Sequence, residues 1–304
     1  MSNEFEIVKS TRIAHINLFL NELEYRTSHM HGEFEVIYVI TNPLKVRYPE
    51  TEFILREGEG CIVNPNQVHQ LEKTGKASTF ICLQFSPLLF ESTFTVLKDM
   101  RFKSGSVFNK EMRDTLLSLS LKWQNPDDSM NLEIHSLLFH LVYTMVGNIE
   151  YHLMNKKEKQ EEEDNIARIA RLLRFIDQNY THKIRLSDFA ESENLSLSYV
   201  SHYAKRMLSE PFQDYVNFLR FSYAKKLLTS STASLTETAY LSGFSNLNYM
   251  NLTFMKHAGM TAKEYRNSMD SKPSEDMKRH ISAHSSEKYH SRRRSIEILE
   301  SLMH

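Results

Sequence analysis

The chain has 304 residues, of which 41% are apolar, and it contains 18 Phe, 14 Tyr and two Cys. Apolar residues this numerous exclude a disordered chain, and two cysteines exclude a disulfide framework. The net charge of −1 is unevenly distributed: residues 1–164 carry −7 (17 Lys and Arg, 24 Asp and Glu) and residues 165–304 carry +6 (20 and 14). We therefore expect an acidic domain for a small ligand or partner and a basic domain for a polyanion.

Membrane and secreted proteins are also excluded by the sequence pattern. No apolar run approaches the ~18 residues that a membrane span needs. Met1–Lys9 lacks the pattern of a signal peptide, and the low cysteine content is typical of the reducing cytosol. We expect a cytoplasmic protein without a membrane partner.

Residues 5–85 are predicted to form short strands. β-branched and aromatic runs occur at Phe34–Ile40, Phe53–Leu55, Gly60–Val63 and Thr79–Phe85, with turn residues such as Asn64-Pro65-Asn66 between them. Strands of this length and spacing indicate a sandwich or a small barrel.

Helical patterns follow from Pro87 onward. Apolar residues recur at helical spacing over Lys110–Lys122 and, more strongly, over Asn131–Leu153. The second helix needs a partner for its apolar stripe. It either packs on the barrel or forms an isologous homodimer interface, and we expect the dimer because the stripe is longer than one barrel side requires.

A mixed-charge run then marks a domain boundary. Residues 156–165 lack a continuous apolar pattern and are predicted to be a solvated linker. Residues 166–268 are predicted to be helical throughout. The polar tail, residues 269–304, holds Lys278-Arg279 and Arg292-Arg293-Arg294, and its composition predicts mobility, with a short helix over Ser295–Leu302 as an alternative.

The basic half contains an internal repeat. Ala190, Leu195 and Ser196 recur 49 residues later as Ala239, Phe244 and Ser245 in type and spacing, while Tyr199 and Val200 recur at a spacing of 50 as Tyr249 and Met250. In each copy a small residue allows two helices to approach, an apolar residue fills the corner and a serine suits the N-cap of the second helix. Asn194 and Gly243 are suited to positive φ in the turn, and Ser234–Glu237 is a capping-box sequence.

Two helices at such a turn form a helix-turn-helix, whose second helix enters the major groove of DNA. A single copy is more often a plain helix pair, but two copies in register in the basic half favour DNA binding. The connecting segment Phe212–Leu228 is predicted to be a rigid helix that separates the two recognition helices. Their expected DNA-contacting residues are Ser198, Ser201, His202 and Lys205 in the first copy, and Asn246, Asn248, Asn251 and Lys256 in the second.

Residues 185–266 resemble the DNA-binding domain of the AraC/XylS family of bacterial transcription regulators. The matching residues are Leu186, Phe189-Ala190, Ser196, Ser198-Tyr199-Val200, Lys205, Phe212, Tyr215, Arg220, Ala224, Leu227-Leu228, Ala239, Gly243-Phe244-Ser245, Asn248-Tyr249, Phe254, Lys256, Gly259, Thr261 and Tyr265-Arg266. The resemblance implies an effector-controlled regulator, usually an activator, that works with RNA polymerase.

The acidic half carries a histidine-rich motif. His29, His31 and Glu35 form a His-x-His-x3-Glu pattern, and His69 follows after two turn signals. This half resembles a cupin barrel, the usual sensor domain of the family. The resemblance implies an effector site formed by His29, His31, Glu35, Tyr38, His69 and Gln84, which suits a polyhydroxylated ligand such as a sugar. We expect no cofactor, and a metal held by His29, His31, Glu35 and His69 is the less favoured alternative.

The sequence therefore predicts an α+β two-domain protein. Residues 1–155 would be a cupin-like β-barrel with helices that binds the effector and dimerises, and residues 166–268 an all-α domain with two helix-turn-helix units. The predicted function is a sequence-specific DNA-binding transcription regulator, not an enzyme. The alternatives are a metal-dependent cupin enzyme with a helical appendage and, more weakly, a DNA-binding protein controlled only by protein contacts.

Overall fold

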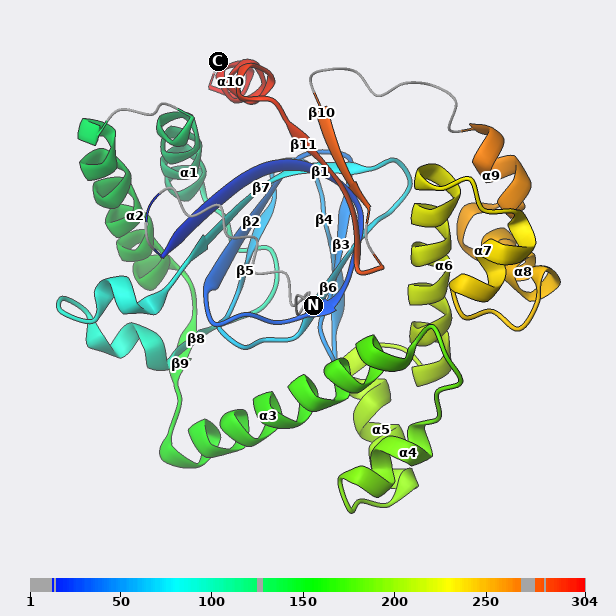
Figure 1. The fold of residues 1–304 in the computed structure, drawn as a ribbon. Coiled ribbons are helices and arrows are strands. Elements are labelled where there is room, and N and C mark those ends of the chain that lie inside the picture. Colours follow the sequence, from blue (N-terminus) through cyan, green and yellow to red (C-terminus); the bar gives the residue numbers. More distant parts are fainter. Residues whose placement is uncertain (1–12, 14, 125–127, 269–276, 282, 304) are drawn as a thin grey trace.

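The computed structural model describes residues 13, 15–124, 128–268, 277–281 and 283–303 (Figure 1). An antiparallel barrel occupies the centre of the molecule, with helices α1 and α2 on one side and helices α6 to α9 on the other (Figure 1). The predicted fold class, a cupin-like barrel followed by an all-α helix-turn-helix region, is confirmed. None of the helices in the described part of the chain combines the length and the apolar character that a membrane crossing requires.

The barrel is built around its long first strand. β1 pairs with β7 through its first half and with β6 through its second half, so the sheet bends around it in the order β4-β3-β6-β1-β7-β2-β5. The strands are β1 (Ile16–His29), β2 (Phe34–Thr41), β3 (Leu44–Arg47), β4 (Glu52–Leu55), β5 (Gly60–Val63), β6 (His69–Lys73) and β7 (Ser78–Phe85).

Alternation along the strands gives the barrel two apolar faces. On β2, Ile37 and Val39 belong to the core inside the barrel, whereas Val36 and Tyr38 belong to the core on its outer face. The outer core is covered by α1 (Lys110–Trp123) and α2 (Asp128–Asn148). Two short 3-10 helices, Pro87–Phe90 and Thr95–Asp99, and the strand pair β8 (Met100–Phe102) and β9 (Tyr151–Leu153) complete this side.

The helix predicted over Asn131–Leu153 ends earlier than expected. α2 stops at Asn148, and Tyr151–Leu153 forms β9 instead. Ile134, Leu138 and Leu141 of α2 are fully buried in the outer core of the barrel. Packing on the barrel, one of the two interpretations of this helix, is therefore present, and a dimer interface would have to use the opposite face.

Residues 156–165, predicted to be a solvated linker, are helical in the structure. These residues begin a continuous helix, α3 (Lys156–Asn179), which opens with a capping box formed by Asn155 and Glu158. Lys, Glu and Gln favour helix over coil, and Glu162 is held by Arg101 of β8 at 2.7–3.1 Å. The charged residues of this segment therefore form a helix, and one of them, Glu162, holds the helix against the barrel side of the molecule.

The helical region that follows contains six helices in its described residues, α4 (Leu186–Ser192), α5 (Leu197–Leu208), α6 (Phe212–Ser230), α7 (Leu235–Leu241), α8 (Leu247–Ala258) and α9 (Ala262–Ser268). It has two cores. One joins α3, α4, α5 and the start of α6, and the other joins the end of α6 with α7, α8 and α9. The barrel residue Val68 is buried in the first of these cores, so the two halves of the chain are packed together.

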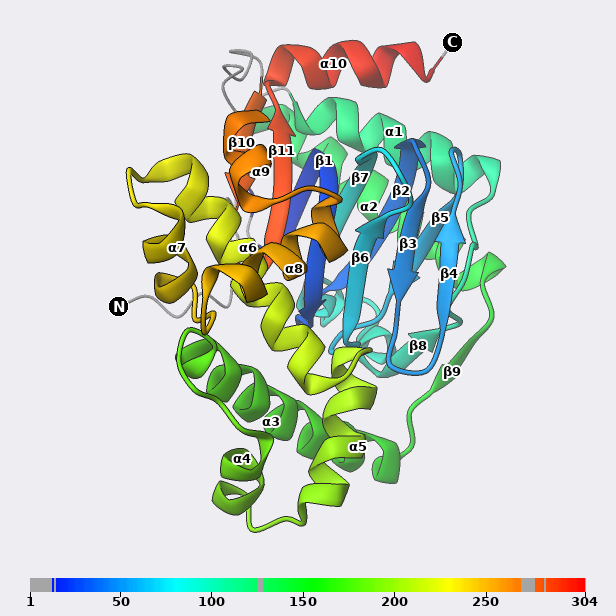
Figure 2. The same cartoon turned by 90° about the vertical axis from the view of Figure 1, so that its right-hand side faces the viewer.

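The tail returns to the barrel, which corrects the prediction of a mobile segment. Residues 269–276, 282 and 304 lie outside the described residues, but β10 (Met277–Ile281) and β11 (Ser285–His290) form a hairpin, and β11 pairs with β1. Glu287 of β11 is 1% exposed and its carboxylate contacts the Arg26 guanidinium at 2.6 Å. The expected short helix is α10 (Arg292–Ser301), which lies along α1 with Leu299 fully buried (Figure 2).

Candidate functional site

The first helix-turn-helix consists of α4 and α5. Ala190 is 3% exposed, and its carbonyl accepts a hydrogen bond from the Leu195 N–H at 2.9 Å across the turn. Asn194 adopts φ +54°, the left-handed conformation expected of it. The Ser196 hydroxyl caps α5 by accepting from the Tyr199 N–H at 3.2 Å. The local chemistry of the first copy is therefore as predicted.

The second helix-turn-helix consists of α7 and α8. The Ala239 carbonyl accepts from the Phe244 N–H at 2.9 Å, and Gly243 adopts φ +87°. A Cβ on Gly243 would lie 2.7 Å from the backbone of Thr181, so glycine also permits a close approach between the units. The N-cap of α8 is Asn246 and not the predicted Ser245, because the extra residue of this copy extends the turn.

Helix α6 connects the two units, as predicted for Phe212–Leu228. It has 19 residues, about 28 Å along its axis. Arg220 on α6 donates to the carbonyls of Tyr180 and His182 at 2.6 and 2.7 Å, which fixes the end of α3 against the spacer. The units therefore have a rigid connection.

The four residues predicted to contact DNA on α5 are all exposed. Ser198, Ser201, His202 and Lys205 project from one side of the helix, while Val200 and Ala204 are buried on the other. Arg206, which the sequence analysis did not single out, is exposed beside Lys205. This side of α5 therefore offers hydroxyl, imidazole and cationic groups.

On α8, only Asn248 of the four predicted residues has an exposed side chain without another assigned contact among the described residues. Asn246 accepts from the Tyr249 N–H at 2.8 Å as the N-cap. Asn251 accepts from the Ala262 N–H at 3.1 Å and so positions α9. Lys256 lies 3.3 Å from the carboxylate of Asp214 on α6.

Two exposed residues of α8 were missed by the sequence analysis. Leu252 is 67% exposed and Met255 is 50% exposed. Both were passed over because only polar side chains were sought, yet their spacing from Asn248, four and seven residues, places all three on one face.

A second candidate site lies at one end of the barrel. His29 and His69 are paired across β1 and β6, and Glu35 and Gln84 are paired across β2 and β7. His31 follows the end of β1, and its Nε2 lies 2.9 Å from Glu35. The ligand atoms of the three histidines and Glu35 all lie within 4.8 Å of one another, so the predicted motif is brought together.

Hydrogen bonds orient the imidazole rings of this histidine cluster. The Nδ1 atoms of His29, His31 and His69 lie 2.8, 3.1 and 2.9 Å from the backbone carbonyls of Thr27, Glu33 and Gln67. Since a carbonyl can only accept, each Nδ1 carries the proton and each Nε2 is directed toward the cluster. The Nε2 atoms of His29 and His69 are buried without a hydrogen-bond partner.

The cluster holds opposite charges in a buried setting. Burial opposes protonation of His31, but the hydrogen bond and charge of Glu35 raise its pKa. Burial also disfavours the Glu35 carboxylate, yet the hydrogen bond and the charge of His31 hold the pKa of Glu35 well below the usual range. Burial lowers the pKa of His29 well below its ordinary value. These directions favour an ion pair between His31 and Glu35 beside a neutral His29.

One predicted member of this site is elsewhere. Tyr38 lies three residues from Glu35 on β2 and so points to the opposite face, where its ring packs 5.6 Å from that of Phe108. Gln84 is in the cluster and donates to Glu35 at 2.6 Å. Cys61 and Cys82 are buried strand residues, and burial raises the pKa of both thiols.

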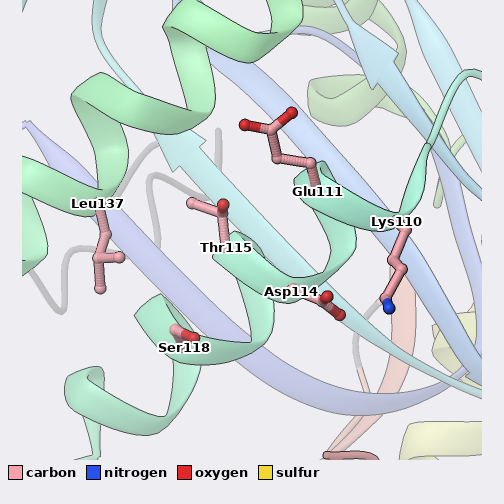
Figure 3. Close-up of a pocket in the computed structure, with 6 residues that line it drawn as sticks. All are labelled: Lys110, Glu111, Asp114, Thr115, Ser118 and Leu137. Carbon is pink, nitrogen blue, oxygen red and sulfur yellow. The ribbon is translucent and has the colours of Figure 1, made fainter.

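Two hollows of the surface lie outside the barrel. One, of about 510 Å³, opens between α1 and α2 and is lined by Lys110, Glu111, Asp114, Thr115, Ser118 and Leu137 (Figure 3). Another, of about 360 Å³, lies between the barrel and α3, and its lining includes Met30, between His29 and His31. Neither hollow has a member of the histidine cluster among its lining residues.

The strand that carries His29 also contacts the helical region. Lys225 of α6 reaches Glu24 of β1 at 3.2 Å, and the rings of Tyr25 and Phe218 meet edge to face at 4.9 Å. The Ser28 hydroxyl donates to the Leu208 carbonyl at the end of α5, 3.1 Å away. β1 therefore links the histidine cluster to a recognition helix and to the spacer helix.

Comparison with known families covers both halves of the chain. The profile described as "AraC-like ligand binding domain" matches residues 21–142, and that described as "Helix-turn-helix domain" matches residues 189–268. The two matches coincide with the barrel side and with the helical region.

Three similar proteins are regulators by name. The "Uncharacterized HTH-type transcriptional regulator YdeC" of Bacillus subtilis is 25% identical over 258 residues, covering 80% of this chain and 86% of that protein. The "Melibiose operon regulatory protein" of Escherichia coli K12 is 24% identical over 264 residues, covering 81% and 87%. The "HTH-type transcriptional activator RhaS" of E. coli is 30% identical over 119 residues, covering 39% and 43%.

Proposed function

Because the chain belongs to the AraC/XylS family of DNA-binding transcription regulators, we propose that an effector bound at the histidine cluster controls how α5 and α8 read DNA. The observation that carries this proposal is the pair of helix-turn-helix units, in which α5 exposes a polar and cationic side and α8 exposes Asn248 near its start. The named relatives are regulators, which agrees with the expectation that this chain is not an enzyme.

The proposed DNA contacts use both recognition helices. Ser198, Ser201, His202 and Lys205 of α5 would reach one stretch of major groove, and Asn248 of α8 would reach another. The spacer of about 28 Å is close to one helical turn of DNA, so both helices would contact the same side of the duplex. Asn246, Asn251 and Lys256 would act by holding α8 in place.

The proposed effector is a sugar. Support comes from the melibiose operon regulator among the relatives and from the chemistry of His29, His31, Glu35, His69 and Gln84. Buried carboxylate, amide and imidazole groups can accept and donate hydrogen bonds to hydroxyls that a sugar presents at fixed angles.

A divalent transition metal is the second candidate for this site. Two buried Nε2 atoms without a partner face a carboxylate and a third imidazole, and backbone carbonyls hold the rings by their Nδ1–H groups. Three imidazoles and a carboxylate suit Zn²⁺ or iron, and such outer hydrogen bonds are typical of metal-binding histidines. A metal would take the place of the proton that His31 shares with Glu35.

We propose that β1 transmits the state of the cluster to the DNA-binding region. His29 is five residues from Glu24, which contacts Lys225 of α6, and Ser28 contacts the end of α5. An effector that favours a shifted end of β1 would change the docking of both helices, and only a difference in its affinity for the two arrangements can do this.

The remaining assignments concern organisation and partners. We propose that residues 1–155 bind the effector and dimerise, and that residues 166–268 bind DNA. Leu132 and Tyr143 of α2 are 79% and 75% exposed on the face away from the barrel and would form the homodimer contact. From the membership in this family we further propose that the protein activates transcription through RNA polymerase and that it is located in the cytoplasm.

A test compares ligand binding with DNA binding on the full chain. We expect melibiose or another member of a sugar panel, or Zn²⁺, to raise the melting temperature and to change the affinity for a selected operator duplex. His69→Ala should remove both effects, while Ser118→Ala in the hollow between α1 and α2 should retain them. Ligand binding that survives in His69→Ala would place the effector elsewhere.

A further inference from the structure

The exposed side of α8 has an unusual composition for a helix that reads DNA. Asn248, Leu252 and Met255 follow one another at spacings of four and three residues and form a single stripe, called here the α8 stripe. Leu252 is 67% exposed and Met255 is 50% exposed, whereas Met250 and Phe254 are fully buried on the opposite side. The stripe is therefore an outward face of a well-packed helix.

The stripe carries an amide and two apolar groups. The nearest cation along the helix, Lys256, lies 3.3 Å from the Asp214 carboxylate, which directs its charge toward α6. Exposed apolar groups in a row typically mark a surface that another molecule covers. The partner of the stripe should therefore offer hydrogen-bonding groups to the amide and apolar groups to Leu252 and Met255.

Base edges offer a match to this chemistry. In the major groove, thymine alone presents a methyl group, and adenine presents the N7 and N6 pair that an Asn side chain binds with two hydrogen bonds. We propose that the α8 stripe reads a half-site of A·T pairs, with Asn248 on an adenine and Leu252 and Met255 against thymine methyl groups. The inference rests on the proposed function, in which α8 enters the major groove.

The position of the stripe favours DNA over a protein partner. Asn248 is in the first turn of α8, directly after the Asn246 cap and the Gly243 turn, and the start of a recognition helix is the part that reaches base edges. A surface for RNA polymerase would not need an amide at this position. Binding of a protein by the stripe is treated as an outcome of the test.

The other recognition helix differs in chemistry. α5 exposes Ser198, Ser201 and His202 together with the cations Lys205 and Arg206. Such groups can bind guanine or phosphate and make no use of a methyl group. The operator should therefore have two unlike half-sites, of which the one under α8 depends on thymine.

The test begins with selection of duplexes from a random pool by the full chain. In the enriched sequence, each thymine is then replaced by deoxyuridine, which removes only the methyl group. Replacement under α8 should weaken binding about fourfold per contacted thymine, the factor for about 0.8 kcal/mol of lost apolar contact. In Leu252→Ala the same replacement should have no effect at that thymine.

Two further variants make the result specific. Leu252→Arg should change the selected base at its position from thymine to guanine, because Arg binds guanine O6 and N7. Ile54→Ala, at an exposed apolar residue on the barrel (51% exposed, against 67% for Leu252), should select the same operator as the unaltered chain.

The outcomes separate the inference from the proposed function. Failure to enrich any sequence would refute the proposed function itself. Enrichment of an operator that binds equally well with uracil, or that Leu252→Ala and Leu252→Arg select unchanged, would overturn the inference alone. The same would follow if these variants lost only binding to RNA polymerase.

Discussion

Replacing Lys225 by Met tests the docking of the spacer helix on the barrel. The Lys225 side chain is 7% exposed, its ammonium group lies 3.2 Å from the Glu24 carboxylate, and it lies over the rings of Tyr25 and Phe221 at 5.3 and 5.6 Å. Methionine retains the packing on the rings and removes the charge. The substitution therefore isolates the ion pair between α6 and β1.

The magnitude follows from the ionisation of Glu24. Burial opposes the charged form, but Lys225, Ser286 and Lys73 lower the pKa of Glu24 from 4.5 to about 2. A net difference of this size corresponds to roughly 3 kcal/mol of folding free energy, which the three partners together supply beyond the cost of burying the carboxylate. We expect Lys225→Met to lower the free energy of unfolding by about 1–3 kcal/mol at pH 7.

The assay is urea denaturation of four proteins, the unaltered chain, Lys225→Met, Glu24→Gln and the double variant. A coupling energy of about 1–3 kcal/mol between the two positions is expected. Because the pKa of Glu24 is lowered in the folded state, the stabilisation is fully present above pH 4.5 and is lost as the pH falls toward 2. The deficit of Lys225→Met should shrink over the same interval.

A second experiment measures the affinity of Lys225→Met for the operator with and without the ligand. If β1 transmits the effector signal through this contact, operator affinity in Lys225→Met should no longer respond to the ligand that changes it in the unaltered chain. Strictly additive stability effects of the two single variants, or an unaltered ligand response, would refute the reasoning.

The other predictions address the DNA contacts and the returning tail. Lys205→Ala should weaken binding to all duplexes and flatten its salt dependence, measured by titration at several salt concentrations; an unchanged slope would argue against a phosphate contact. Asn248→Ala should cost about 1–3 kcal/mol on the selected operator and spare random DNA in the same titration, and equal losses would show that Asn248 does not read bases. Glu287→Gln should lower the free energy of unfolding, measured in urea, by about 3 kcal/mol, because Arg26 would remain buried without its carboxylate partner. A change within about ±0.5 kcal/mol, which is typical of surface substitutions, would contradict this role of the tail.

Features fixed by local chemistry were predictable from the sequence. The turns with Asn194 and Gly243, the Ser196 cap and the Ser234–Glu237 capping box all depend on residues a few positions apart. The second copy shows the limit of such reasoning, since one inserted residue moved the cap from Ser245 to Asn246. For the same reason Asn246, which was predicted to contact DNA, caps α8 instead.

The sequence predicted the residues that form the histidine cluster, but it also assigned to the cluster a residue that lies elsewhere. His29, His31, Glu35 and His69 meet because strand pairing places them at one end of the barrel. Tyr38 was assigned to the same site although an offset of three residues along a strand reverses the face. Strict alternation from Glu35 would have excluded it.

Long-range pairing was beyond the reach of the sequence. β11 adds to β1 across about 260 residues of sequence, and the polar composition of the tail gave no signal of this pairing. The buried carboxylate of Glu287 is stabilised by the charge of Arg26 and by a hydrogen bond from the Asn21 amide, and both partners lie on β1. The contacts of Glu162 with Arg101 are likewise tertiary, and they turned a predicted linker into a docked helix.

The most direct test of the account is the affinity of the full chain for its selected operator relative to a scrambled duplex of the same length and composition, measured at one physiological salt concentration. The account predicts a ratio of at least about a thousandfold, as for other sequence-specific DNA-binding proteins. It also predicts that this ratio falls when Asn248 is replaced by Ala. Equal affinity for the two duplexes would contradict sequence-specific reading by α5 and α8.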